Sequence, residues 1–545
     1  MTERQPSSQT WNRDEVRHLL GRISFAVDEN QVTQLEALSR GEAIDRLLTE
    51  ARQAPSPKPP GWVKSPWVNT ERRYKDTTPE EFRKMHGMTN GRYSREITDL
   101  RRWWLDEMIS TAVPLREIMT LFWHGHFASS IEKVLVSQAM YQQNVTQRQY
   151  ALGNYREFLR EMTLDPAMLV YLDLEDSDRV KPNENYAREL YELFALGHGN
   201  YSQQDIMETA RALSGLRLDA APGVELSGRE TDPELNRRFS RDGLIPQLVA
   251  ERHDDGQKTL FGRTGDLGLD EVIFLTANHP ACGRFLAGKL VRFFAVSDPQ
   301  GRVQAQMAAE FQASQGEIAS MLRVMFTSQE FYSAESRAKL IKSPIKLLVG
   351  VARQLVLDVT ITSGINRYLA ALGQGLFSPP NVKGWPGGET WISAGTLALR
   401  YHLADLILDS KEPPGMEPIG RERGRPVPLP KDPVERQEML QTMMTGDPPR
   451  QGEGSDAEAM AVRSLQRAPA GKAVQIKFAV RNVFPNGIPE SVDQLVDQLL
   501  ARLFSYSPRD ELRLAACRAA SRTSGEDRVH AVLRVALSSP DYQLD

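Results

Sequence analysis

Apolar side chains recur along most of the chain at the spacing of an α-helix. In TDLRRWWLDEMISTAV, the residues Leu100, Trp103, Trp104 and Met108 fall on one side of a helix with about 3.6 residues per turn. The same period continues in NHPACGRFLAGKLVRFFAV, GEIASMLRVMFTSQEF and KSPIKLLVGVARQLVL, and few stretches show the alternation of strands. The pattern predicts an all-α fold, with a large multi-helix, bundle-like domain.

Helix-boundary signals occur where these apolar stripes begin and end. Asp165 followed by Pro166 is typical of an N-cap and the first helical residue. The helix NENYARELYELFALGHG is expected to stop at Gly197, because glycine favours the position just after a helix. Ser202, three residues before Asp205, resembles a capping box at the start of the next helix.

Two stretches interrupt the helical pattern. Residues 54–95 carry APSPKPPGWVKSPW and a charged tract, which we interpret as a surface excursion of the main domain. Residues 411–470 are rich in Pro, Gly and charge, which predicts a flexible linker with one short helix near 434–444. The predicted organisation is a disordered N-terminus (1–13), a main helical domain (14–410), the linker (411–470) and a C-terminal helical segment (471–545).

A short stretch of the C-terminal segment is similar in sequence to a stretch of the main domain. The stretch LRVMFTSQEF at 322–331 aligns with LRVALSSPDY at 533–542, and each lies at the end of an amphipathic helix. Ten residues are too few to prove a duplication. Equivalent helix ends nevertheless predict that the C-terminal segment packs back on the main domain.

Composition and charge exclude several classes of protein. Lys and Arg number 67 and Asp and Glu number 71, so the net charge of -4 gives no electrostatic basis for binding nucleic acid. The two cysteines, Cys282 and Cys517, lie far apart, which excludes a disulfide framework and a thiolate zinc site. No apolar run predicts a membrane span, and MTERQPSSQTWNRDEV lacks the pattern of an export signal. The sequence therefore predicts a soluble cytoplasmic protein, with export alongside a partner left open.

Two histidines stand one residue apart in the apolar stretch LFWHGHFASSIEKV at 121–134. On a helix, which turns about 100° per residue, the side chains of His124 and His126 point roughly 200° apart. They cannot both bind one metal ion unless the helix breaks at Gly125, since a helical zinc pair needs the spacing i, i+4. We expect one of them, His126, to face the interior.

The stretch PNENYARELYELF concentrates polar side chains on one helix. Asn185, Glu189 and Glu192 follow the spacing i, i+4, i+7, and Glu184 can pair with Arg188 beside them. The group is either a carboxylate cluster for acid/base chemistry or metal binding, or a solvated face with pairs within the helix.

Two further stretches offer charged groups beside helix or loop ends. In ERHDDGQKTLFG, a predicted loop brings His253, Asp254 and Lys258 together, either as a base next to a cation or as an ordinary charged turn. In NHPACGRFLAGKL, His279 and Arg284 stand at the start of a helix, which either binds an anion or is capped for structural reasons.

The loop FSPPNVKGWPGGETWIS contains the tryptophans Trp385 and Trp391. Exposed indole rings could stack on sugar rings, whereas a buried ring would fill a hydrophobic hole beneath a rigid turn. The nucleophile elbow of α/β-hydrolases, the dinucleotide glycine fingerprint and the zincin His-Glu-x-x-His are all absent from the sequence.

Five of these segments together resemble one known family. WHGHF, PNENYARELYELFALGHGNYSQQDIMETARALSG, HDDGQKTLFG, NHPACGRFLAGKL and FSPPNVKGWPGG occur in the order seen in the bacterial family called domain of unknown function 1800 (DUF1800), over residues 14–405. The resemblance implies an all-helical protein and carries no established activity. It also implies a sulfatase-like (DUF1501-type) partner, because such proteins are often encoded beside members of this family. Many members carry export signals, and none is visible at the start of this sequence.

The resemblance selects the candidate site residues. We hypothesise an enzyme acting on an anionic, phosphate- or sulfate-bearing substrate, with catalytic candidates His126, Glu189, Glu192, His253 and Asp254 and substrate-binding candidates Asn185, Arg188, Lys258, His279 and Arg284. The sequence identifies neither a metal nor a cofactor. The alternatives are a non-catalytic assembly or maturation partner of the sulfatase-like protein, whose polar residues form a buried ion-pair network, or a carbohydrate-binding protein that uses Trp385 and Trp391.

Overall fold

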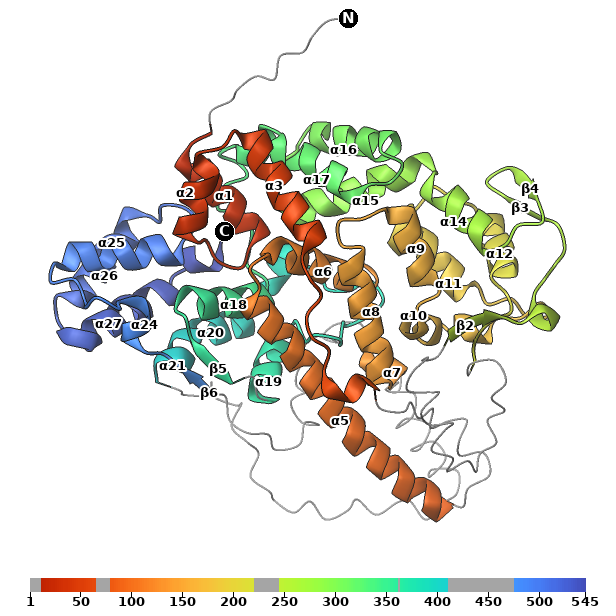
Figure 1. Ribbon diagram of the computed structural model, residues 1–545, viewed down its shortest axis with the longest axis horizontal. Helices are drawn as coiled ribbons and strands as arrows, with labels where there is room; N and C mark the ends of the chain where they lie inside the picture. Colours follow the sequence, from red (N-terminus) through yellow and green to blue (C-terminus); the bar gives the residue numbers. More distant parts are fainter. Residues whose placement is uncertain (1–10, 65–78, 220–244, 361–362, 410–474) are drawn as a thin grey trace, which may run out of the picture.

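Helices make up most of the described part of the chain (Figure 1). The computed structural model describes residues 11–64, 79–219, 245–360, 363–409 and 475–545. Within these ranges the strands are short and form three antiparallel pairs. The predicted all-α class is therefore confirmed, with these small pairs as an addition that the helical period did not predict.

The elements have the following bounds. The N-terminal half contains α1 (Arg13–Ile23), α2 (Glu29–Glu36), α3 (Arg40–Gln53), η1 (Gly61–Lys64), α5 (Pro79–Ser110), α6 (Pro114–His126), α7 (Ile131–Val134), α8 (Ser137–Gln149), α9 (Tyr155–Thr163), α10 (Pro166–Tyr171), η2 (Leu174–Asp176), α11 (Glu184–Glu189), the π-helix η3 (Leu190–Ala195) and α12 (Gln203–Ala212). The central part contains η4 (Ala250–Arg252), α14 (Leu269–Ala277), α15 (Pro280–Phe293), α16 (Arg302–Ala313), α17 (Ile318–Thr327), η5 (Glu330–Tyr332), α18 (Pro344–Gln354), α19 (Ser363–Ala371), η6 (Gly388–Trp391), α20 (Ala394–Tyr401) and α21 (Leu403–Leu408). The C-terminal segment contains α24 (Val480–Val483), α25 (Val492–Leu503), α26 (Asp510–Ala520), α27 (Gly525–Leu537) and η7 (Asp541–Gln543). The strand pairs are β1 (Leu216–Asp219) with β2 (Ile245–Leu248), β3 (Lys258–Leu260) with β4 (Arg263–Gly265), and β5 (Asp358–Thr360) with β6 (Gln475–Lys477).

Local capping explains where several helices begin. The Asp165 side chain accepts a hydrogen bond from the Met168 amide (3.0 Å) and Pro166 follows as the first helical residue of α10, as predicted. Ser202 and Asp205 form the reciprocal capping box of α12, with distances of 3.1 and 2.8 Å. These polar side chains satisfy backbone N–H groups that the first turn of a helix leaves without a partner.

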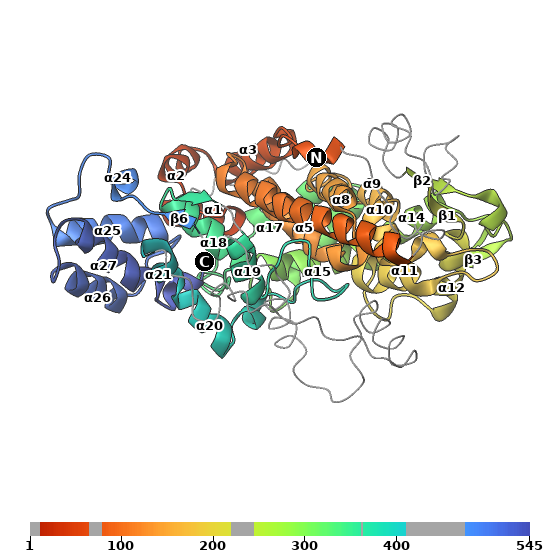
Figure 2. The same ribbon diagram turned by 90° about the horizontal axis from the view of Figure 1, so that it is seen from below.

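A single hydrophobic cluster joins the two ends of the molecule. Helices α25, α26 and α27 pack together at one end, and α12 with the β3–β4 pair lies at the other (Figures 1 and 2). Leu495, Leu533 and Tyr542 of the C-terminal segment belong to the same buried cluster as Leu19 and Trp123. The prediction that the C-terminal segment packs back on the main body is confirmed.

Backbone and charge contacts hold the C-terminal segment in place. Leu340 and Asp545 exchange two backbone hydrogen bonds of 3.2 and 2.8 Å. The buried Asp545 carboxylate lies 3.0 Å from Lys346 Nζ and 3.7 Å from Lys342 Nζ. Burial alone would raise the pKa of Asp545, but these cations and Arg22 outweigh it and hold the pKa below its ordinary value.

The two similar stretches also share a local structure. In the first, α17 is followed by the 3₁₀ turn η5, and in the second α27 is followed by η7. Phe331 and Tyr542, the aromatic residues that end the two stretches, are both buried. The two ends are therefore equivalent in conformation and in what they bury.

Two of the three sequence-based boundaries can be compared with the structure. Trp11, which we expected in a disordered N-terminus, is buried and donates from Nε1 to the Leu38 carbonyl (3.1 Å), because its ring has an apolar site to fill. Helix α5 begins at Pro79, so the later part of the expected surface excursion at 54–95 is helical. The expected linker at 411–470, with its helix near 434–444, lies outside the described residues.

None of the described helices is both long enough and apolar enough to span a membrane.

A buried ion pair connects three helices in the middle of the fold. Glu117 of α6 receives two hydrogen bonds from the Arg148 guanidinium of α8 (2.8 and 2.9 Å) and one from Trp104 Nε1 of α5 (2.9 Å). Arg116 Nε lies 3.7 Å from the same carboxylate. The Glu117 side chain is fully buried and that of Arg148 is 2% exposed, so each charge depends on the other.

We predict that Glu117→Gln lowers the free energy of unfolding by about 3–5 kcal/mol, because it leaves the Arg148 charge buried without a counter-charge. Urea unfolding followed by circular dichroism measures the loss. The double variant Glu117→Leu/Arg148→Met should recover most of it, since apolar side chains of similar volume replace the whole pair. A loss below about 1 kcal/mol in Glu117→Gln, as for an exposed pair, would contradict the assigned role.

Candidate functional site

The two histidines of WHGHF contact different parts of the molecule. His124 Nε2 accepts a hydrogen bond from the Phe377 amide (3.0 Å), and its ring meets the edge of Trp104. His126 Nδ1 lies 3.0 Å from Lys289 Nζ of α15. Both side chains are buried, and α6 continues to His126 without a break at Gly125. The two rings therefore do not converge on one metal ion.

A loop from the distant PNVKGW segment covers the end of α6. Gly384 has φ = +74°, and a Cβ added to it would lie 2.1 Å from the Gly125 carbonyl oxygen, so only glycine fits this approach. The ring of Trp385 lies 5.4 Å from that of His124, and Trp391 is buried. The two tryptophans thus pack within the fold, and the carbohydrate-binding alternative stays a prediction without a further observation to support it.

A π-helix supplies backbone acceptors beside His126. Helix α11 widens into η3, and the amides of Leu196 and Gly197 both donate to the Tyr191 carbonyl. Side chains then satisfy the next carbonyls: Lys289 Nζ donates to Leu193 (2.8 Å), and Tyr155 Oη donates to Phe194 (2.6 Å). The widened turn thereby fixes where Lys289 lies.

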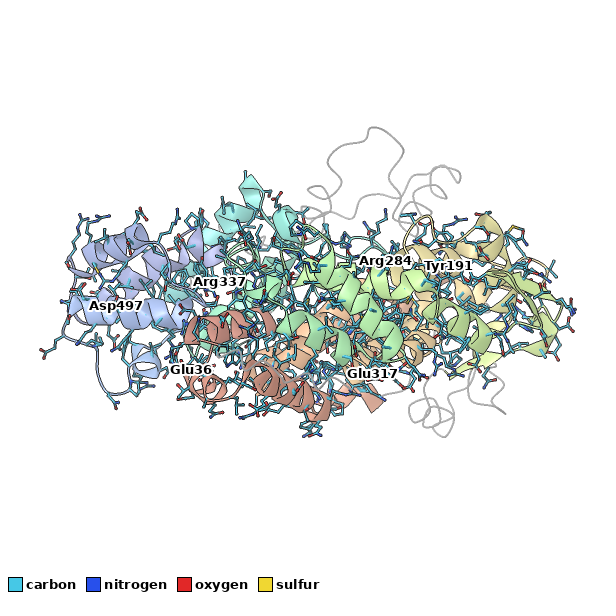
Figure 3. The ribbon with its side chains drawn as sticks, turned by 90° about the horizontal axis from the view of Figure 1, so that it is seen from above. Glu36, Tyr191, Arg284, Glu317, Arg337 and Asp497 are labelled. Carbon is cyan, nitrogen blue, oxygen red and sulfur yellow. The ribbon has the colours of Figure 1, made fainter. Side chains whose placement is uncertain are left out.

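An open pocket of about 440 Å³ lies between η3, α15 and α16. Its walls carry Leu196, Gly197, Asn200, His279, Pro280, Ala281, Arg284, Phe285 and Gln304. Figure 3 shows Arg284 and Tyr191, from the neighbouring α15 and η3, far from Asp497 of the C-terminal segment. Two of the predicted substrate-binding residues, His279 and Arg284, therefore share one pocket.

The polar groups of this pocket differ in how they are engaged. His279 Nδ1 accepts a hydrogen bond from the Ala281 amide (3.2 Å), which leaves the proton of the neutral ring on Nε2 as a donor. Burial lowers the pKa of His279, although Asp205 acts in the opposite direction. The exposed Arg284 side chain makes no ion pair within the described residues. The pocket therefore presents donors and an uncompensated positive charge.

The carboxylates of the NENYARE helix form a charged face of their own. Arg188 lies 3.1 Å from Glu184 and 4.0 Å from Glu192, and Glu192 lies 3.7 Å from His198 Nδ1. Burial, followed by the charge of Glu192, raises the pKa of Glu189. In contrast, Asn185 is engaged in structure, because its Nδ2 donates to the Leu172 carbonyl (3.2 Å).

The HDDGQK loop is tied to α12 and not to the pocket. His253 Nδ1 lies 2.9 Å from the Ser214 carbonyl oxygen. Asp254 forms a bidentate pair with Arg211 (2.7 and 3.1 Å), whose hydrogen bonds hold the pKa of Asp254 down. The buried Lys258 donates to the Gly256 carbonyl (3.0 Å). These three candidates have local partners, and their catalytic or binding roles stay predictions.

Comparison with protein families now places the chain. A family model described as "Protein of unknown function (DUF1800)" matches residues 18–544. The chain belongs to this family. The match extends past the resemblance at 14–405 and includes α24 to α27, so the C-terminal segment is part of the DUF1800 unit. No match was found among the curated proteins or among the solved structures.

Lys289 lies beside this pocket and was not among the candidate site residues selected from the sequence. It lies on α15 with Ala281 and Phe285 at the spacing i, i+4, i+8, one turn beyond the two residues of this row that line the pocket. Burial, followed by the charge of Arg292, lowers the pKa of Lys289 to about 7. The lone lysine within the apolar FLAGKLVRFF was the available signal, but its partner His126 is 163 residues away.

We predict that replacing Lys289 by Met removes a pH dependence of stability. The pKa of Lys289 is about 7 in the folded chain, and an unfolded lysine titrates near 10.4, so between these values the unfolded chain binds more protons. The free energy of unfolding of the wild type therefore increases relative to that of Lys289→Met as the pH rises from about 7 to about 10.

Urea unfolding at both ends of this pH window measures the effect. The exposed Lys339→Met serves as the matched control, and its difference from the wild type should be the same at both pH values. If the Lys289→Met difference were equally independent of pH, the proposed desolvation of the Lys289 ammonium would be wrong.

Proposed function

We propose that the pocket between η3, α15 and α16 binds an anionic ligand that carries a phosphate or sulfate group. The observation that carries the proposal is the exposed Arg284 guanidinium, which lines the pocket and has no carboxylate partner among the described residues. Planar guanidinium groups match the oxygens of phosphate and sulfate through paired hydrogen bonds.

Other charges of α15 support an anion at this place. Lys289 and Arg292 lie on the same helix, and within the described residues they too form no ion pair with a carboxylate. The positive end of the 14-residue helix α15 faces the pocket at Pro280 and Ala281. The Ala281 amide is already used by His279, so Arg284 and the His279 Nε2–H group are the direct donors in this proposal.

The remaining walls suggest that the ligand also has an organic part. Leu196 and Phe285 supply apolar surface, while Asn200 and Gln304 offer amide groups beside it. A hydrolytic or group-transfer reaction is the finer proposal. In it, Glu189 is the candidate base, since its raised pKa favours proton exchange closer to neutral pH, and Glu192 and His126 are further candidates. The candidates His253 and Asp254 would have to act away from this pocket, because their loop is tied to α12.

We predict that Arg284→Gln weakens the binding of phenyl phosphate and phenyl sulfate by about tenfold or more, because one charge-assisted hydrogen bond contributes roughly 1.5–3 kcal/mol. Isothermal titration calorimetry with the purified chain measures the affinity. Arg518→Gln, an exposed arginine on α26, is the matched control and should bind as the wild type does.

Two outcomes would overturn the anion proposal. The first is wild-type protein that binds neither anion, and the second is binding that Arg284→Gln leaves unchanged. Phenol, which lacks the anionic group, should bind far more weakly than either ester, because it makes no use of the arginine. An unchanged melting temperature of Arg284→Gln would show that the variant is folded.

A second proposal concerns a partner protein. We propose association with a sulfatase-like (DUF1501-type) protein, which the resemblance to DUF1800 implies, and a pocket for sulfate or phosphate esters would suit a chain that works beside such a protein. Co-expression of the two chains with a tag on one of them should yield a complex that stays together in size-exclusion chromatography. Separate elution of the two chains at micromolar concentration would count against this partner.

A further inference from the structure

Lys289 is surrounded by acceptors and by an aromatic ring, and it forms no ion pair with a carboxylate in the part of the chain that the structure describes. From α6 it faces His126 Nδ1 at 3.0 Å, and from η3 it faces the Leu193 carbonyl oxygen at 2.8 Å. On its own helix, Nζ lies 5.0 Å from the centre of the Phe285 ring, and Arg292 is the nearby charge. An ammonium group in such surroundings loses its proton more easily than one in water.

His126 is a hydrogen-bond acceptor for this amine. Its side chain is 3% exposed, and burial followed by the charge of Lys289 keeps its pKa well below the ordinary value, so the ring stays neutral. A protonated lysine has no acceptor, so the neutral His126 ring accepts a hydrogen bond from Lys289 Nζ at Nδ1. A lysine that is desolvated beside another cationic group is one arrangement found for activated nucleophiles.

The pocket approaches this amine along one row of α15. Ala281 and Phe285 line the pocket, and Lys289, which is outside the lining, is the next residue of the same i, i+4 row. The Phe285 ring lies 5.0 Å from Nζ and is closely packed against Gly197, where an added Cβ would lie 2.9 Å from the ring. Arg284 precedes Lys289 by five residues, which is about 1.4 helical turns or roughly 7.5 Å along α15.

We propose that Lys289 is a carbonyl-reactive amine and that the ligand of the pocket is an anionic aldehyde or 2-oxo acid. The Lys289 amine adds to the carbonyl carbon, and loss of water then leaves an imine between Nζ and that carbon. The ammonium releases its proton to solvent before attack, and the neutral His126 ring orients the amine by accepting a hydrogen bond from Nζ. The inference rests on the proposed function for the anionic group, which Arg284 would hold.

Pyridoxal 5′-phosphate is a suitable probe, because it joins an aldehyde to a phosphate group. The full-length chain is treated with this aldehyde at neutral pH, sodium borohydride then reduces any imine to a stable secondary amine, and peptide mass spectrometry locates the label. We expect Lys289 to be labelled at least about tenfold faster than the exposed Lys339, because a larger fraction of Lys289 is the neutral amine.

Variants and competitors separate this inference from the proposed function. Inorganic phosphate and Arg284→Gln should both slow the labelling of Lys289 without changing that of Lys339. His126→Asn should slow it by removing the Nδ1 acceptor that orients the amine, and Lys289→Arg should abolish the label at this position while keeping a cation there.

Each outcome has a separate meaning. If Lys289 is labelled no faster than Lys339 while phenyl phosphate still binds through Arg284, the reactive amine is wrong and the proposed function stands. If Lys289 is labelled rapidly but phosphate and Arg284→Gln have no effect, the anionic ligand class is wrong, and the proposed function fails with it.

Discussion

The fully buried pairing of Glu117 with Arg148 is the contact on which the candidate site depends. It fixes the first turn of α6 against α5 and α8, since both carboxylate oxygens are engaged. Helix α6 is then a rigid rod of 13 residues whose other end carries His126. The Glu117–Arg148 pair at the start of α6 thereby helps to position the neutral His126 ring at the end of the same helix. Water could not replace either partner without opening the core between three helices.

Helix ends, more than helix faces, create the chemistry of the site. The carbonyl end of η3 and the amide end of α15 meet at the pocket, and each attracts the opposite charge. The Leu193 carbonyl accepts a hydrogen bond from Lys289 Nζ, while the side chain of Arg284 is exposed near the start of α15. Positive charge is therefore gathered around a small space with no described carboxylate to balance it. An anion from solution would complete this arrangement.

Local features of the fold could be predicted from the sequence, and contacts across long chain separations could not. The caps at Asp165 and Ser202 depend only on neighbouring residues, so their patterns were sufficient. The π-helix η3 was missed because its apolar residues keep a spacing close to that of an α-helix. His279 and Arg284 were found as a pair because they are only five positions apart. The environment of Lys289 depends on His126, which lies on a helix far away in the sequence. The ion pair between Asp254 of HDDGQK and Arg211 could not be predicted either, since charge alone does not show which partner a loop residue will contact.

The short pairing of β5 with β6 has a consequence for how the chain is joined. Residues 358–360 pair with residues 475–477, and β6 also contacts α21, so the chain leaves and re-enters the described body at nearly the same place. A protease cut anywhere in 410–474 would therefore not separate the two parts, because the shared apolar core of α18, α21, α25 and α27 would still join them. The two parts on either side of this segment are thus held together by their shared apolar core as well as by the covalent chain.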